Sequence, residues 1–267
     1  MPTVLQESLP LAPWMSEHML RLPGTGPIPL AEWLQRDDAY AAQMAARDAL
    51  VAERADAVHG LLPGAEAAAE ELLGLVLAHL DGVAGYVREG DAVTRPDGVR
   101  VGLDGPPLLV AGRLVQEDLC LLDKAAGEEE HRLVGAILCF PSNWTLAQKL
   151  GGTLGRIHLP IESYDAGVAR RVQRMFDLIR PEAPVMRANL IVYSEGDLHN
   201  PRAEFERHTP APGTGRFVRV ERQTMLRLPR TRAMVFSIHT YMVALSALTP
   251  EQRAGLEAAR PGAFEPA

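Results

Sequence analysis

The C-terminal third of the sequence decides the fold. Residues 217–226, FVRVERQTML, are followed after a short turn by residues 233–241, AMVFSIHTY. Both segments are rich in β-branched, aromatic and other apolar residues, and Pro229 lies in the turn between them. This pattern predicts a β-hairpin. A third strand is expected immediately upstream, over residues 186–193, MRANLIVY.

Two more strands are expected earlier in the chain. Residues 119–122, LCLL, predict a short buried strand, and residues 133–140, LVGAILCF, predict a second strand across a polar turn. The residues between these strands and residue 186 predict helices, which include an apolar stripe over 168–179. A capping box at 249–252, TPEQ, predicts a final helix.

The order of elements is two strands, then helices, then three strands. It predicts an α+β fold, in which an antiparallel five-stranded sheet carries helices on one face. The same order is found in PAS domains, a comparison that concerns fold and not function.

We expect three regions along the chain. Residues 1–30, with scattered prolines and glycines, predict an extended N-terminal arm. Residues 31–112 predict a helical extension, with helices over 40–58 and 72–80, and a connecting region with at most short strands. Residues 113–267 predict the PAS-like core.

Composition narrows the function classes. The chain has 267 residues, 47% hydrophobic and 23% charged, which is typical of a globular protein. A formal net charge of -7 argues against a nucleic-acid partner. The sequence contains no apolar run long enough to span a membrane, and its first residues do not resemble a signal peptide. Cys120 and Cys139 lie in apolar segments, which favours reduced thiols in a cytoplasmic protein.

Several common cofactor and catalytic motifs are missing from the sequence. It contains neither G-x-G-x-x-G nor a P-loop, and neither C-x-x-C, G-x-S-x-G nor H-E-x-x-H. If the protein performs redox chemistry, its electrons therefore come from another source.

His158 is the first candidate functional residue. It lies in the segment GRIHLPI, residues 155–161, between two expected helices. A neutral imidazole held beside Pro160 could bind a haem iron. The alternative is a histidine of the core that is hydrogen-bonded to the backbone.

Glu221 and Arg222 are the next candidates. The period of a strand places Arg219, Glu221 and Gln223 on one face, and Arg222 on the other. Arg222 could bind a haem propionate, and Glu221 could bind an ammonium group. The alternative is an internal cross-strand ion pair, for instance with Arg187 on the neighbouring strand. Because neighbours in a strand point apart, we expect one of the two to be structural.

The strand over 186–193 offers secondary candidates. Arg187 and Asn189 share a face with Tyr193, and they could line a cavity or bind edge backbone groups. His239 alternates away from the apolar residues of its strand. It is expected to be exposed or packed under a flanking segment.

Five of these segments, in order, resemble one known family. They are QEDLC (116–120), LCFPSNW (138–144), IHLP (157–160), RAN (187–189) and VERQT (220–224). The chain resembles the haem-dependent oxidative N-demethylase family from about Tyr40 to Tyr241. This family has a PAS-like fold.

The resemblance implies a haem monooxygenase. Haem b would be held in the PAS-like core, with its iron bound by His158. The enzyme would oxidise an N-methyl group of a small amine such as dimethylamine with O2, and it would release formaldehyde. A separate reductase subunit, which carries FMN and an iron–sulfur cluster, would supply the electrons.

Within such an enzyme, we assign roles to the strand residues from their charge and position. Glu221 would contact the amine, and Arg222 would bind a propionate or polarise oxygen during catalysis. Arg187 and Asn189 would be secondary substrate contacts. The chain has Leu190 where the family often has tryptophan, and His239 where it often has arginine. The amine, the reductase and the oligomeric state therefore stay open.

Two other functions are compatible with the same residues. The chain could be a haem-binding PAS-like sensor or ligand-binding module without turnover. It could also be a haem-free structural subunit of an enzyme complex.

Overall fold

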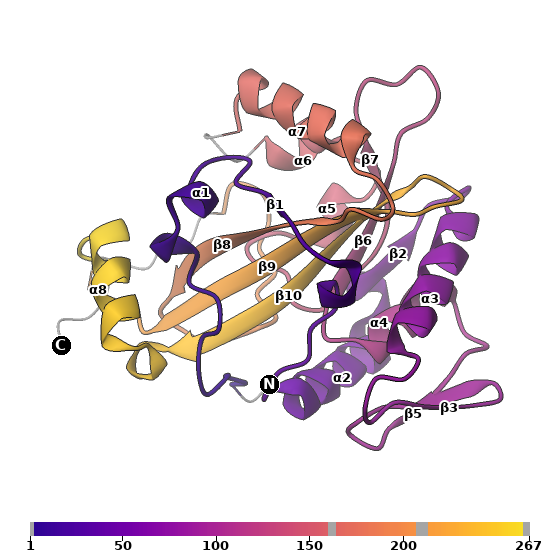
Figure 1. Ribbon diagram of the computed structural model, residues 1–267, viewed down its shortest axis with the longest axis horizontal. Helices are drawn as coiled ribbons and strands as arrows, with labels where there is room; N and C mark the ends of the chain where they lie inside the picture. The colour runs from indigo at the N-terminus through magenta and orange to yellow at the C-terminus, as the bar shows by residue number, and fades with distance from the viewer. Residues whose placement is uncertain (1–2, 160–163, 207–212, 264–267) are drawn as a thin grey trace.

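The computed structural model describes residues 3–159, 164–206 and 213–263, and it has a mixed helix and antiparallel-sheet fold (Figure 1). The α+β class predicted from the sequence is confirmed. The main sheet has the strand order β1-β8-β9-β10-β6-β7-β2 within the described residues. Its strands are β1 (Gly26–Pro27), β2 (His59–Leu61), β6 (Asp118–Asp123), β7 (Arg132–Ile137), β8 (Val185–Tyr193), β9 (Phe217–Arg227) and β10 (Met234–Ala244).

The prediction of a five-stranded PAS-like sheet was wrong, because the described sheet has seven strands. The five expected strands are all present and adjacent. The arm adds β1 beside β8, with Gly26 opposite Met186, and β2 pairs with β7. Strands of two and three residues are too short to show a period of two in the sequence. They nevertheless cover edges that would otherwise expose unpaired backbone groups.

The prediction that helices cover one face was also wrong. On one face, α2 (Tyr40–Val58), α3 (Glu66–Leu80) and α4 (Pro107–Leu114) form one core with Leu119 and Ile137 of the sheet. On the other, α5 (Leu146–Lys149), α6 (Leu154–His158) and α7 (Ala166–Leu178) pack on Cys120 and Ala136. Since alternate residues of β6 are apolar on both faces, both faces require cover.

Helix α4 begins within residues 82–112, which were expected to form a connecting region with at most short strands, and ends just beyond that region at Leu114. The same region holds a small sheet of β3 (Val87–Glu89), β4 (Ala92–Thr94) and β5 (Arg100–Gly102). A Cβ atom at Gly112 of α4 would come within 2.5 Å of Ile137 Cγ1. The absence of a side chain at this position lets α4 lie directly against β7.

The N-terminal arm and the last helix pack together at the end of the main sheet that lies away from α3 and the small sheet (Figure 1). In the structure the arm continues past residue 30 to the start of α2 at Tyr40. It contains short helical segments at η1 (Pro13–Met15), α1 (Glu17–Leu20) and η2 (Leu30–Glu32), and η3 (Leu245–Ala247) precedes α8 (Pro250–Ala259). Trp14 packs with Val220 and Leu256, and its indole Nε1 donates to Gln252 O at 2.9 Å. The capping box predicted at the start of α8 is confirmed between Thr249 and Gln252.

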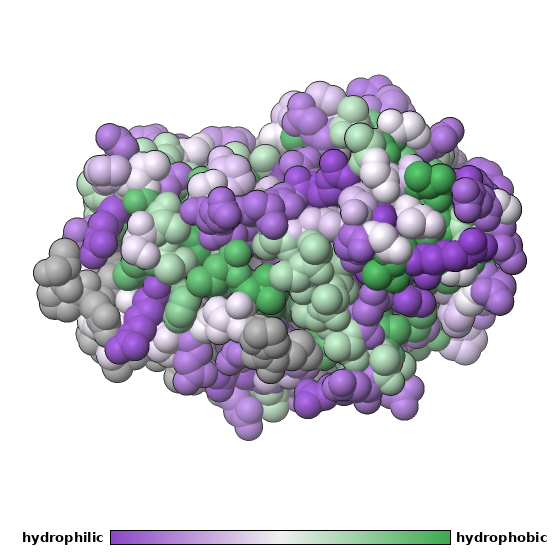
Figure 2. Space-filling view, turned by 90° about the horizontal axis from the view of Figure 1, so that it is seen from below, coloured by the Kyte–Doolittle hydropathy of each residue, from purple (hydrophilic) through white to green (hydrophobic). Residues whose placement is uncertain are grey.

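The surface mixes polar and apolar residues. Seen from below, apolar residues form a broken band across the middle of the molecule, with hydrophilic residues around it (Figure 2). Such mixing is ordinary, because apolar atoms make up much of any folded surface. Of the helices that the structure describes, none is both long and apolar enough to cross a membrane. Cys120 and Cys139 are buried and carry free thiols.

Candidate functional site

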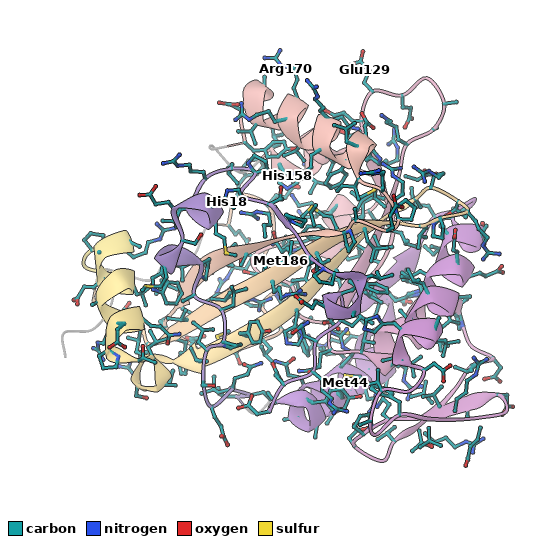
Figure 3. All side chains as sticks on the ribbon, viewed as in Figure 1. His18, Met44, Glu129, His158, Arg170 and Met186 are labelled. Atoms are coloured by element: carbon teal, nitrogen blue, oxygen red, sulfur yellow. The ribbon has the colours of Figure 1, made fainter. Side chains whose placement is uncertain are left out.

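His158 is the last residue of the short helix α6, on the sheet face covered by α5, α6 and α7 (Figure 3). His158 was predicted to lie in a segment between two helices, whereas it belongs to a short helix of its own. The Thr153 side chain caps α6 by accepting from Arg156 N, and Glu130 Oε2 accepts from Gly155 N at 3.0 Å. Pro160, expected to fix the position of the ring, lies outside the described residues.

The imidazole of His158 is held in one tautomer. Its Nδ1 lies 2.8 Å from Leu154 O, and a carbonyl oxygen can only accept, so Nδ1 carries the proton. Within the described chain, no residue forms a hydrogen bond with Nε2. Burial lowers the pKa of His158; the bond to Leu154 opposes this effect, and the charges of Lys149 and Arg187 add to it. The ring is therefore neutral near pH 7, with the lone pair of Nε2 available to a metal.

Tyr164 stacks on the imidazole. The two ring centroids are 4.2 Å apart and the planes differ by 14°. The tyrosine hydroxyl is buried and has no hydrogen-bond partner among the described residues, and burial raises its pKa to about 12. The stack restricts rotation of the His158 ring.

A row of polar side chains lies on the same face of the sheet as α6. Arg187 and Asn189 of β8 are opposite Gln223 and Glu221 of β9 in the strand register. They alternate with residues of the other face, and Met225, two positions further along β9, packs in the cluster beneath α5, α6 and α7. The sequence placed Arg187 with Asn189 on one face of their strand and Glu221 with Gln223 on one face of the next, and the strand register brings these two sets to the same face of the sheet.

Glu221 has a positive partner inside the protein. Its Oε1 accepts from Nε of the fully buried Arg219 at 3.0 Å. Its Oε2 accepts from Asn189 Nδ2 at 2.9 Å and from Gln223 Nε2 at 3.1 Å. The ion pair of Glu221 is therefore formed within its own strand, with Arg219, and among the described residues none is formed between Glu221 and Arg187 of the neighbouring strand. The alternation pattern placed Arg219 on this face, and that was the signal available to find it.

Arg187 binds neutral oxygen atoms. Its Nη1 donates to Gln223 Oε1 at 2.6 Å, and its Nε donates to Pro23 O of the arm at 3.1 Å. The side chain is half-buried, and burial lowers the pKa of Arg187, an effect that the charge of Glu221 opposes. A ligand carboxylate would supply the strong anionic partner that this guanidinium lacks among its hydrogen bonds.

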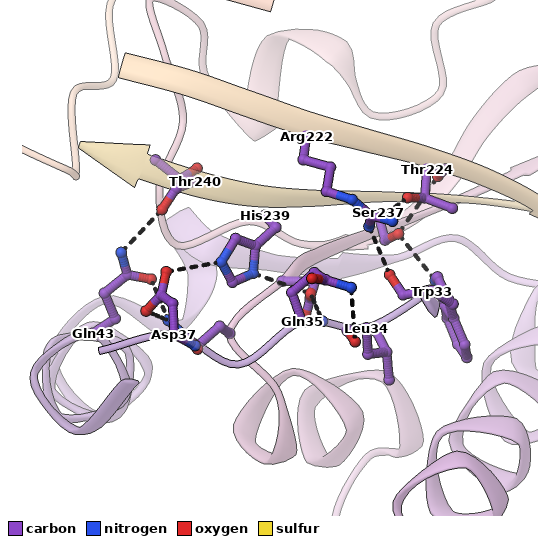
Figure 4. A network of polar contacts seen from close by, with 12 residues as sticks. Trp33, Leu34, Gln35, Asp37, Gln43, Arg222, Thr224, Ser237, His239 and Thr240 are labelled. Atoms are coloured by element: carbon purple, nitrogen blue, oxygen red, sulfur yellow. Dashed lines mark hydrogen bonds and ion pairs between the residues drawn. The ribbon is translucent and has the colours of Figure 1, made fainter. Parts of the chain in front are cut away.

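Arg222 does not join this row, because it lies on the opposite face of the sheet under the arm (Figure 4). Its guanidinium donates to Trp33 O at 3.0 Å, to Glu32 O at 2.7 Å and to Thr224 Oγ1 at 3.1 Å. The geometry therefore separates Arg222 from His158, and its donors serve the backbone of the arm.

The same face contains a buried charge cluster centred on His239. Its Nε2 lies 3.0 Å from Asp37 Oδ2, and its Nδ1 lies 3.1 Å from Glu117 Oε1. Asp37 also accepts from Gln6 Nε2 and Gln116 Nε2, both at 2.8 Å. Of the two alternatives for His239, packing under a flanking segment is confirmed. Asp37 and Glu117 were missed, because nothing in the local sequence relates them to residue 239.

The donor set at His158 suits haem better than a bare metal ion. Among residues 3–159, 164–206 and 213–263, no three histidine, cysteine, aspartate or glutamate residues come together to hold a metal. A porphyrin supplies four ligands of its own, so one neutral imidazole is sufficient, and Arg187 suits a propionate. The residues present therefore fit this cofactor.

The comparison with protein families agrees with this chemistry. The model described as "Haem-dependent oxidative N-demethylase, alpha subunit-like" matches residues 24–260. The matched range includes α6, the polar row on β8 and β9, and the whole of α8. The chain therefore belongs to the family of proteins like the alpha subunit of haem-dependent oxidative N-demethylase.

Proposed function

We propose that this chain is the haem-binding subunit of an oxidative N-demethylase, with haem b bound through Nε2 of His158. The observation that carries the proposal is the fixed tautomer of His158, whose Nδ1 is bound to Leu154 O while Nε2 has no described partner. Arg187 would bind a propionate, since its present partners are neutral oxygen atoms. Residues 113–267 would form the haem-binding core, supported by the extension over 31–112 and by the arm over 1–30.

The substrate we propose is a small methylated amine such as dimethylamine. Glu221 supplies negative charge to the polar row, and Asn189 and Gln223 hold its carboxylate in place. A protonated amine would bind there by charge-assisted hydrogen bonds. The side chains of the row would hold the N-methyl group toward the bound haem, and the covering helices α5, α6 and α7 would limit the access of water.

Bound haem would supply the O2 chemistry of a monooxygenase. In the overall reaction, dimethylamine, O2, two electrons and two protons give methylamine, formaldehyde and water. One oxygen atom enters formaldehyde and the other enters water. The carbon of the methyl group is oxidised, and its bond to nitrogen is replaced by an N–H bond.

A separate reductase subunit would deliver the two electrons. The family description names an alpha subunit, and the sequence contains no motif for a flavin or an iron–sulfur cluster. We therefore assign FMN and the cluster to the partner. The two buried free thiols support a cytoplasmic location.

A haem-binding sensor without turnover is the second candidate. One observation favours it: the charge of Glu221 is already balanced by Arg219. An amine would therefore meet a carboxylate whose hydrogen-bonding capacity is largely used.

The test begins with the purified protein reconstituted with haemin. We expect a Soret band that is lost in His158→Ala and retained in His199→Ala. His199 is a suitable control, because its Nδ1 also binds a backbone carbonyl, Cys139 O at 2.8 Å. A colourless wild-type protein after reconstitution would overturn the proposal.

Turnover separates the two candidates. Dimethylamine, O2 and a photoreduced free flavin as electron donor should give formaldehyde with wild type and none with His158→Ala. A normal Soret band without formaldehyde formation would favour the sensor.

A further inference from the structure

Helix α6 is too short to orient His158 without help. It has five residues, and isolated helices below about 12–15 residues are marginal in water. Leu154 is its buried apolar anchor, while Leu159, the residue after His158, is 65% exposed. The direction of the imidazole therefore depends on contacts between the end of α6 and the rest of the protein.

Besides the stack on Tyr164, the polar contacts of Arg156 and Lys149 at this end of α6 converge on Glu204. Its two carboxylate oxygens accept from Nη1 and Nη2 of Arg156, both at 2.8 Å. Its Oε1 also lies 2.9 Å from Lys149 Nζ at the end of α5, and the side chain of Glu204 is only 8% exposed. One carboxylate thus joins two cationic side chains from two helices.

Lys149 extends this connection to the residue before His158. Its Nζ donates to Ile157 O, a carbonyl in the last turn of α6. The side chain of Arg156 and the carbonyl of Ile157, which immediately precede the imidazole, are therefore both fixed. A cation at the C-terminal end of a helix is also favourable for the helix dipole.

Glu204 is itself fixed to α5. Its backbone N donates to Gln148 Oε1 at 3.0 Å. Hydrogen bonds from Arg156 and Lys149 lower the pKa of Glu204 to about 2, so the carboxylate is charged at neutral pH. Without this charge, Lys149 of α5 and Arg156 of α6 would be two like charges close together, and they would repel each other.

We propose that Glu204, through Lys149 and Arg156, is a positioning residue that fixes the orientation of the His158 imidazole. The inference rests on the proposed function, because the orientation of Nε2 is important to a protein that binds iron through this atom. The effect of Glu204 on the orientation of the ring can be tested without haem.

The first experiment uses the full-length apoprotein. In Glu204→Ala, amide hydrogen exchange over residues 154–159 should be at least tenfold faster than in wild type. The imidazole proton resonances of His158 should move toward the positions of free histidine, because the stack on Tyr164 loosens. Glu204→Gln keeps the shape of the side chain and should show a smaller change of the same kind.

Asp48→Asn is the matched control. Asp48 also bridges two arginines, with Arg95 Nη2 at 2.8 Å and Arg113 Nε at 3.0 Å, on the other side of the sheet. The Asp48→Asn variant should lose about as much global stability as Glu204→Ala. The amide exchange of residues 154–159 and the His158 resonances should stay as in wild type. Equal changes in Asp48→Asn and Glu204→Ala, or no change in Glu204→Ala, would overturn the proposal.

The second experiment adds haemin. Glu204→Ala should bind it roughly tenfold more weakly, with a broadened Soret band, and Asp48→Asn should match wild type. If wild type binds no haemin, the proposed function fails, while the exchange and resonance data still decide whether Glu204 orients the ring. If Glu204→Ala binds haemin with an unaltered band, the positioning role fails and the proposed function stands.

Discussion

Glu221 and Arg222 are consecutive in β9, and their side chains serve opposite faces of the sheet. Glu221 binds Arg219 and Asn189 on the face of α6, whereas Arg222 binds backbone oxygens of the arm on the other face. The separation follows from the pleat of a strand, which turns successive side chains to opposite sides. Substitutions at these two neighbours should therefore have unrelated consequences.

Glu221→Gln should destabilise the protein by about 3–5 kcal/mol, because it leaves the fully buried Arg219 without its counterion. Urea denaturation measures the change. The double variant Arg219→Gln with Glu221→Gln should recover part of the loss, since neither charge is then stranded. An undiminished free energy of unfolding in the single variant would show that Arg219 finds another anion.

Arg222→Leu should loosen the N-terminal arm and leave haemin binding intact. Two backbone carbonyls, Trp33 O and Glu32 O, would lose their donor, at a cost of roughly 1–3 kcal/mol each. Limited proteolysis should cut the arm faster than in wild type, with an unchanged Soret band. A lost Soret band in a folded variant would instead connect Arg222 to the cofactor.

The His239 cluster should make stability depend on alkaline pH. Burial opposes the charge on the ring, but the hydrogen bonds and charges of Asp37 and Glu117 outweigh it and raise the pKa of His239 to about 9. Because folding raises the pKa of His239, its charged ring stabilises the folded protein fully at pH values below the ordinary pKa of 6.5. This stabilisation is lost as the pH rises through about 9. The loss should be roughly 3 kcal/mol.

Denaturation of wild type and His239→Gln at pH 6, 7.5 and 9.5 measures this effect. The variant should be less stable at pH 6 and nearly flat across the window. At the acid end, burial raises the pKa of Asp37, but the contacts with His239, Gln116 and Gln6 outweigh burial and lower this pKa overall. Asp37 should therefore keep its contribution to stability until the pH falls below the usual pKa range of an aspartate. Parallel curves for the two proteins would contradict a charged His239.

Tyr164→Phe and Tyr164→Leu should separate ring stacking from the hydroxyl. Phenylalanine keeps the stack on His158 and removes a buried hydroxyl without a described partner, so haemin binding should be close to wild type. Leucine removes the stack, and the Soret band should shift or broaden. The opposite order of effects would mean that the hydroxyl itself contacts the ligand.

Gly112→Ala should destabilise the protein by about 1–3 kcal/mol, because the added Cβ would lie 2.5 Å from Ile137 Cγ1. Gly74→Ala in α3 is the matched control, since its Cβ would meet nothing within 4 Å. That change should stabilise by up to about 1 kcal/mol, because alanine favours the helix. Thermal unfolding of both variants tests the close packing of α4 on β7.

The sequence by itself determined the features that depend on neighbours in the chain. Strand alternation put Arg187 with Asn189, and Glu221 with Arg219, on one face of their own strands, and the capping box at Thr249 and Gln252 began α8. These follow from periods of two residues and from a single helical turn, which are local properties. His158 was selected in the same way, from its apolar surroundings.

Only the tertiary structure decided which groups meet across long stretches of chain. Asp37 reaches His239 over 202 residues, and Pro23 accepts from Arg187 over 164 residues. The edge strands β1 and β2 and the helices on both faces depend equally on distant partners. No local period encodes such contacts, because buried charges and unpaired strand edges take whichever partner the packed chain brings to them.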